Sequence, residues 1–234
     1  VLVPMALLGI LLAACQPASP PPTQGESDVK AGSTNEAQAP DPSLAWQACV
    51  DSFIDGYFER NPVFAASSGK HEFDGQLPKY TPEAMADKAK WLHGQRDTVA
   101  AFTDESLDTQ QQFERGYVLS LIDSQLFMLE DSGFPYNNPA YYAGDLSPSM
   151  YLTRPYAPLP ERMAAFNRYL EALPAAIKQI RENMHPPLPV TYVDLGINMF
   201  EGYSSFFTND VPEIFAAVAN PDLQPRFLLA NEAA

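Results

Sequence analysis

The chain has 234 residues, and 14 Lys and Arg side chains against 29 Asp and Glu side chains give it a formal net charge of −15 at pH 7. So acidic a protein has no cationic surplus with which to displace counterions from phosphates, which argues against direct binding of nucleic acid. Hydrophobic residues make up 46% of the chain, enough to build a folded core. The two cysteines, Cys15 and Cys49, are too few for a disulfide framework or a multi-thiolate zinc site.

Residues 1–15 are similar to a bacterial lipoprotein signal peptide. The apolar run from Met5 to Ala14 is too short to span a bilayer, which takes about 20 residues, but it suits a secretory signal. It ends in Leu12-Ala13-Ala14-Cys15, which resembles the lipobox, so Cys15 is the predicted lipidation site. The alternative is a buried apolar segment that ends in cysteine by chance.

The segment after Cys15 has the composition of a tether. Residues 16–42 contain six prolines among Gln, Ser, Thr, Gly and Ala and no aromatic residue, which predicts a flexible stalk. Gln16, in place of Asp, favours the outer membrane of a Gram-negative cell, facing the periplasm. Because no Lys or Arg precedes Lys30, the basic start of the signal is missing, and the gene product is expected to begin upstream of residue 1.

Residues 43–234 are predicted to form an all-α domain, a multi-helix array. Apolar residues recur at steps of three and four with no sustained strand-type alternation. Pro174 lies inside the longest apolar seam and predicts a kink or two abutting helices there. The predicted helices cover residues 43–60, 82–102, 106–131, 163–184, 192–206 and 212–219.

The stretch 134–160 differs from the rest of the domain because it holds six prolines and five tyrosines. This composition favours an ordered aromatic connection, in which the rings pack while the hydroxyls stay hydrogen-bonded. Four of its tyrosines are candidate lining for a substrate cleft, although packing in a core or hinge is the more ordinary role for each: Tyr141, Tyr142, Tyr151 and Tyr156.

No residue in this chain lies in a sequence motif that indicates a catalytic or metal-binding role. The three histidines, His71, His93 and His185, have no second histidine one helical turn away, and Gly75 stands where an H-E-x-x-H motif begun at His71 would need its second histidine. They are interpreted as surface or capping residues. Cys49 falls on the apolar face of its helix and is interpreted as a buried thiol.

Several short phrases occur in a fixed order along the chain. The clearest is a Gly-x-His-x-x-Asp-Gly-x-Leu turn, formed here by Gly69, His71, Asp74, Gly75 and Leu77. It is followed by Asn138-Pro139-Ala140-Tyr141, Arg162, Arg168-Tyr169-Leu170, Leu173-Pro174 and Arg181-Glu182-Asn183-Met184. In this order the phrases resemble the bacterial family called domain of unknown function 885.

The resemblance implies a larger all-helical protein. Family members resemble gluzincin-type zinc metallopeptidases whose H-E-x-x-H helix lies in the C-terminal half, beyond residue 234. It therefore implies zinc and a peptide substrate for a full-length protein, and a missing C-terminal half as the partner of this segment. It transfers no catalytic, cofactor or metal residue to this chain, whose own enzymatic activity stays open.

Two functions remain at this point. The first is the N-terminal helical portion of a lipid-anchored, secreted metallopeptidase-like protein. The second is a non-enzymatic acidic helical outer-membrane lipoprotein that acts as a binding or scaffold module. The downstream reading frame, searched for H-E-x-x-H, separates them.

Overall fold

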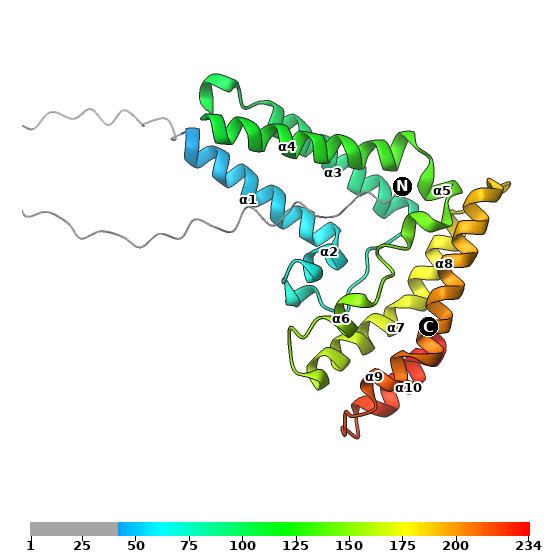
Figure 1. The fold of residues 1–234 in the computed structure, drawn as a ribbon. Coiled ribbons are helices and arrows are strands. Elements are labelled where there is room, and N and C mark those ends of the chain that lie inside the picture. The colour runs from blue at the N-terminus through cyan, green and yellow to red at the C-terminus, as the bar shows by residue number, and fades with distance from the viewer. Residues whose placement is uncertain (1–41) are drawn as a thin grey trace, which may run out of the picture. The chain divides into compact units, whose positions relative to one another are not determined.

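The computed structural model describes residues 42–234, which are all-helical and contain no strand within that range (Figure 1). The predicted signal peptide, Cys15 and the predicted stalk up to residue 41 lie outside the described residues. No helix of the described part is long and apolar enough to cross a membrane. The α-helices are α1 (Pro42–Arg60), α2 (Pro62–Ser67), α3 (Pro82–Ala100), α4 (Thr109–Leu126), α5 (Phe134–Asn137), α6 (Ser149–Thr153), α7 (Leu159–Asn183), α8 (Val190–Asn209), α9 (Val211–Phe215) and α10 (Leu223–Ala233).

Four short segments of other helical geometry connect these elements. Three are 3₁₀ turns and one is a π-helix that continues α4. They are η1 (His71–Phe73), η2 (Asp104–Ser106), η3 (Phe127–Asp131) and η4 (Pro139–Tyr142).

Helices α1, α3 and α4 pack side by side around the first of two apolar clusters, the amino-terminal core (Figure 1). Phe53 of α1 stacks on Trp91 of α3 with ring centroids 5.6 Å apart. Trp46 is 1% exposed, and its indole Nε1 donates a 3.1 Å hydrogen bond to Glu114 of α4. The buried members of this core are Trp46, Phe53, Met85, Ala89, Leu92, Val99, Leu107, Val118, Ile122, Leu126 and Leu129.

Side-chain caps fix where two of these helices begin. Thr81 lies just before α3, and its side chain accepts a hydrogen bond from the backbone N–H of Ala84, which confirms the predicted helix start at residue 82. A capping box between Asp108 and Gln111 starts α4 at Thr109, so the prediction of a start near Ser106 is wrong. The predicted end at residue 131 is confirmed, because η3 continues α4 to Asp131 and Gly133 follows with a φ of +66°, which favours glycine.

Helix α4 has apolar residues on more than one side. Phe113 and Tyr117 point away from the core and are 71% and 39% exposed. The helix instead packs through Val118, Ile122 and Leu126, because α1 and α3 lie against that side. Periodicity alone does not distinguish the two sides of a helix that is apolar on both.

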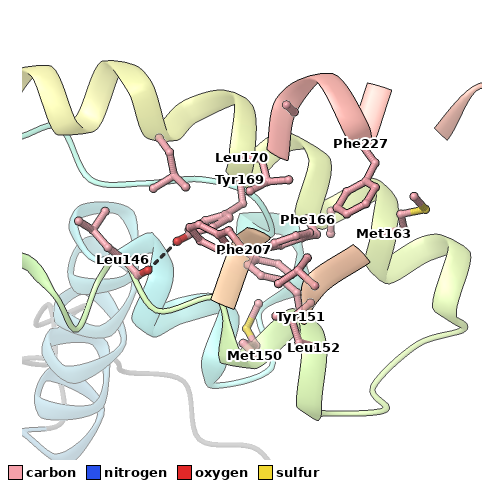
Figure 2. Close-up of a cluster of buried hydrophobic side chains, with 14 of the residues drawn as sticks. Leu146, Met150, Tyr151, Leu152, Met163, Phe166, Tyr169, Leu170, Phe207 and Phe227 are labelled. Carbon is pink, nitrogen blue, oxygen red and sulfur yellow. Dashed lines mark hydrogen bonds between the residues drawn. The ribbon is translucent and has the colours of Figure 1, made fainter. Parts of the chain in front are cut away.

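The second cluster, the carboxyl-terminal core, is organised by α7. The predicted seam is confirmed at Met163, Phe166, Leu170, Leu173 and Ile180, which are all buried. Figure 2 shows Phe166 and Tyr169 at its centre, with the Tyr169 hydroxyl donating a 2.7 Å hydrogen bond to the Leu146 carbonyl. Helix α7 runs unbroken through Pro174, so the prediction of two abutting helices is wrong.

The partner of the α7 seam lies in this chain. Helix α10, which no sequence pattern predicted, packs along α7 through Phe227 and Ala230 (Figure 1). Arg226 of α10 also forms an ion pair with Glu171 of α7. The seam therefore has a partner helix within this chain, and contact of this segment with a C-terminal half stays a prediction.

The proline- and tyrosine-rich connection is ordered, as predicted. It forms α5, η4 and α6, and it places Tyr142 and Tyr151 in the carboxyl-terminal core at 1% and 4% exposure. The Tyr142 hydroxyl donates a 2.7 Å hydrogen bond to the Pro135 carbonyl within the same connection. Tyr136 of the connection packs against the amino-terminal core, so the connection contacts both cores.

Candidate functional site

Asp145 accepts a hydrogen bond from Tyr80 and interacts electrostatically with three further polar side chains, and we call these five residues the Asp145 cluster: Tyr57, Tyr80, Lys88, Tyr141 and Asp145. Tyr57 comes from α1 and Lys88 from α3, whereas Tyr80 precedes α3 and the other two belong to the connection. Tyr57 packs against the amino-terminal core, while Tyr80 and Tyr141 belong to the carboxyl-terminal core. The Asp145 cluster therefore lies where the two cores meet.

The carboxylate of Asp145 is the charged centre of the cluster. Its Oδ2 accepts a 3.2 Å hydrogen bond from the Tyr80 hydroxyl. Burial raises the pKa of Asp145, and the nearby Lys88 ammonium and the Tyr80 hydroxyl oppose this rise because they favour the charged form. Burial likewise lowers the pKa of Lys88, while Asp145 raises it. The two opposite charges attract each other without a direct ion pair in the described structure.

Three tyrosines surround the carboxylate. Burial raises the pKa of Tyr57 to about 12, and the charge of Asp145 adds to the effect. The same two causes raise the pKa of Tyr80 and of Tyr141. The rings of Tyr80 and Tyr141 each meet Tyr142 edge-on, with centroids 5.0 Å apart, so that buried ring forms a rigid base beneath them.

Local contacts fix the positions of the two cations near the cluster, Lys88 and Arg60. The Lys88 Nζ donates a 2.7 Å hydrogen bond to Oδ1 of Asn61, the residue just after α1. Arg60 lies over the Trp91 ring, 4.5 Å from its centroid, and donates to the Gly56 carbonyl. Lys88 is thus the cation that faces Asp145, while Arg60 is held on an aromatic ring.

The motif turn that carries the sequence resemblance has a structural role. We call residues 69–77 the His71 turn. Asp74 is 8% exposed, and its carboxylate contacts His71 Nδ1 at 3.3 Å and accepts a 3.0 Å hydrogen bond from the Tyr156 hydroxyl. The rings of His71 and Tyr156 stack with centroids 4.2 Å apart. Through these contacts of Asp74 and His71 with Tyr156, the turn is bound to the segment that precedes α7.

Gly75 brings the same turn against α7. Its φ of +82° is in the left-handed region, and its N–H donates a 2.8 Å hydrogen bond to the Tyr151 hydroxyl. The Arg168 Nε of α7 donates to the Asp74 carbonyl at 3.3 Å. A side chain at position 75 would meet Arg168 and the Ala165 carbonyl, so only glycine fits.

The sequence-predicted residues fall in different places. Of the four candidate lining tyrosines, only Tyr141 belongs to the Asp145 cluster. Tyr142 and Tyr151 are core residues, and Tyr156 packs on His71. The two buried rings therefore have the core-packing role that the sequence analysis gave as the more ordinary one.

The histidines and the free cysteine all have ordinary surroundings. His93 Nε2 contacts Glu130 at 3.0 Å, and His185 stacks on Tyr136 with centroids 5.1 Å apart. Cys49 is only partly buried, which corrects the expectation of a buried thiol, and burial raises its pKa so that less of it is thiolate. Within residues 42–234, no group of three His, Cys, Asp or Glu side chains converges on a point that could hold a metal ion.

An apolar groove of about 390 Å³ opens between α7 and α8. Leu173, Ile177 and Ile180 line it from α7, and Phe200 and Phe207 from α8. We call it the α7–α8 groove.

The pKa shifts of the buried tyrosines predict that the fold is sensitive to alkali. Burial raises the pKa of Tyr142 and of Tyr151 to about 12, from an ordinary value of 10.0. Ionisation above pH 10 therefore favours the unfolded chain, so stability present below pH 10 is lost as the pH rises towards 12, by about 2 kcal/mol for each ring at pH 12. Urea titrations at stepped pH check this, and a free energy of unfolding that stays constant from pH 9 to pH 12 would contradict it.

The all-helical array defines the class of the protein, and comparison with known proteins gives its family. The model of the family described as bacterial protein of unknown function (DUF885) matches residues 62–234, so the chain belongs to that family. A search of curated proteins gave no significant match.

A solved structure of a candidate lipoprotein of unknown function from Shewanella oneidensis has the same fold. It superposes with a TM-score of 0.70 at 22% sequence identity, over 80% of this chain. The matched region makes up 35% of that longer protein.

Proposed function

We propose that this chain is the N-terminal helical portion of a longer, lipid-anchored envelope protein with a peptidase-like architecture, in which its helices form one wall of a substrate cleft. The observation that carries the proposal is the fold match, which accounts for only 35% of the solved relative. In that arrangement the Asp145 cluster faces the substrate, and the rest of the family domain supplies the opposite wall.

The surface of the C-terminal helices supports the existence of a further packing partner. Val190 and Ile197 of α8 are 72% and 50% exposed, and Leu228 and Leu229 of α10 are 59% and 72% exposed. Exposed apolar side chains on two helices, with an apolar groove beside α8, are features that a further packing partner would cover. We assign them to contact with the remainder of the same family domain.

Catalysis, in this proposal, belongs to that remainder. A catalytic zinc needs about three protein ligands and a general base, and the described residues do not offer such a set. We therefore derive no catalytic step from this chain. Its contribution is to bind and orient a peptide substrate, while zinc is held elsewhere in the full-length protein.

The anchor is the lipid on Cys15, and the proposed location is the periplasmic face of the outer membrane. A diacylglyceryl group on the Cys15 thiol and an amide-linked acyl chain on its amino group would give three acyl chains. Stable membrane attachment requires only two anchoring signals. An acidic domain is repelled by anionic headgroups, so it would not stay on the membrane without this anchor.

Replacing the anchoring cysteine tests this part of the proposal. In a gene that carries the complete signal, Cys15→Ser is expected to move the protein from the membrane fraction to the soluble periplasmic fraction, because the acyl chains are lost. Cys49→Ser is the matched control and should remain with the membranes. A Cys15→Ser protein that still fractionates with membranes would refute lipidation as the anchor.

A further inference from the structure

We propose that the segment that directly follows Ala234 in the longer protein is a helix that lies in the α7–α8 groove. This assignment rests on the proposed function, in which the protein continues beyond residue 234, and it names the partner of the groove. Contact with the remainder of the family domain then begins with the neighbouring stretch of the same polypeptide. The groove is filled by this helix and not by a ligand or a second copy of the protein.

The position of the last described residue is the first support. Helix α10 packs along α7 and ends at Ala233, and Ala234 is itself one of the residues that line the α7–α8 groove. Figure 1 shows this end of the chain, marked C, beside α7 and α8. A segment that follows Ala234 therefore starts at the groove and reaches it through a connection as short as those usual between neighbouring helices.

Helix α8 is the second support, because it has the composition of an interior helix but little of its surface is buried. Asp194 and Glu201 are the only charged side chains among its 20 residues, and apolar side chains occur on most of its sides. Only Gly196 and Phe207 of the helix are buried. It packs on η4 and α9, while the groove separates it from α7. A helix that is apolar on most sides is stable when buried, so the side of α8 that lines the groove requires a cover.

The chemistry of the groove determines the conformation of the segment that fills it. Both walls are apolar, with Leu173 and Ile177 on α7 and Phe200 on α8. An extended segment would place its backbone N–H and C=O groups against side chains that cannot bind them, which is costly. A helix satisfies these groups internally and presents apolar side chains three and four residues apart to the groove. The occupant is therefore an amphipathic helix.

Arg181 of α7 is the charged side chain among the residues that line the groove. It is exposed, and its guanidinium has no hydrogen-bond or ion-pair partner within residues 42–234. Lys178 on the same helix, by contrast, has the Glu182 carboxylate 3.8 Å away. We therefore expect the segment after Ala234 to carry an Asp or Glu that faces Arg181, because a carboxylate can bind a guanidinium through two parallel hydrogen bonds.

Other occupants of the groove fit less well. A free acyl chain or a second copy of the protein would have to compete with a segment that is covalently attached beside the groove. Such an attached segment acts at an effective concentration of about millimolar when the connection is short and flexible. The neighbouring stretch of the same chain is therefore the favoured occupant.

Photo-cross-linking in the full-length protein tests this assignment. Phe200 lines the groove, so Phe200→p-benzoylphenylalanine should form a cross-link within one polypeptide, to a peptide from about the first 25 residues after Ala234, the length of α7. Phe113→p-benzoylphenylalanine is the matched control, because Phe113 is 71% exposed on α4, and it should not give this product. A Phe200 product with a lipid, with a second copy or with a more distant part of the chain would overturn the assignment.

Thiol labelling of the full-length protein provides a second test with smaller substitutions. In a Cys49→Ser background, Ile177→Cys should react with a maleimide at least about tenfold more slowly than Lys178→Cys. The reason is that the added helix covers Ile177 in the groove, whereas the Lys178 side chain is 76% exposed. Equal rates would show that the groove is open in the full-length protein and would overturn the assignment even if the Phe200 variant fails to fold.

The two proposals fail in distinguishable ways. A protein whose intact mass shows that it ends at residue 234 would refute both. A longer, lipid-anchored protein in which the Phe200 probe cross-links elsewhere would refute only the assignment of the groove. A longer protein that shows the expected cross-link but has no lipid on Cys15 would refute only the proposed function.

Discussion

Gly75→Ala is expected to destabilise the protein by about 3 kcal/mol, through backbone strain and steric overlap together. Position 75 has a φ of +82°, which costs free energy for any residue with a Cβ. An added Cβ would also lie 2.5 Å from the Arg168 Cβ and 2.9 Å from the Ala165 carbonyl oxygen. The first is the carbon next to the backbone of α7 and the second is a backbone oxygen of α7, so neither is the mobile end of a side chain.

Gly69→Ala is the matched control for this prediction. Gly69 belongs to the same turn and has a φ of +94°, but no atom lies within 4 Å of the position its Cβ would take. This variant bears the backbone strain alone, about 1 kcal/mol. Urea unfolding of both variants gives the comparison. If the two variants lose equal stability, the close approach of Gly75 to α7 is not what makes glycine necessary.

Phe166→Ala is expected to cost about 4 kcal/mol, because it empties the centre of the carboxyl-terminal core. Phe166 is 0% exposed, and its ring packs on Tyr169, Phe215 and Phe227 with centroids 5.5 to 6.4 Å apart. Phe215 belongs to α9, and Phe227, labelled in Figure 2, belongs to α10, so this one substitution loosens the packing of α7 against both helices.

An exposed phenylalanine provides the control for the core substitution. Phe113 is 71% exposed on α4, so Phe113→Ala should change the free energy of unfolding by no more than about 0.5 kcal/mol. The two variants are compared by urea unfolding under the same conditions. A loss below about 1 kcal/mol for Phe166→Ala would contradict its central place in the core.

Local signals in the sequence account for much of the fold. The Thr81-Pro82-Glu83 start of α3 and the apolar seam of α7 need only nearby residues, and both are confirmed. Helix α10 was missed because its buried residues, Phe227 and Ala230, are too few to establish a helical period. Which side of α4 faces the core depends on α1 and α3, and that is a tertiary effect.

The candidate site was largely invisible in the sequence. Asp145 and Lys88 lie far apart along the chain and belong to no motif, and only the fold brings them together. Tyr141 was noticed through the composition of its segment. The conspicuous motif around His71 has a structural role. Its Gly75 allows the close approach of the turn to α7, and its Asp74 contacts both α7 and the segment before it.

The intact mass of the protein extracted from the membranes of its own host tests the central claim most directly. The account predicts a mature form that begins at a lipid-modified Cys15 and continues beyond residue 234, with a mass well above the 25.8 kDa of the present chain. The fold match to a much longer relative is the reason for that expectation. A mature form without lipid on Cys15, or one no heavier than residues 15–234 with their acyl chains, would contradict it.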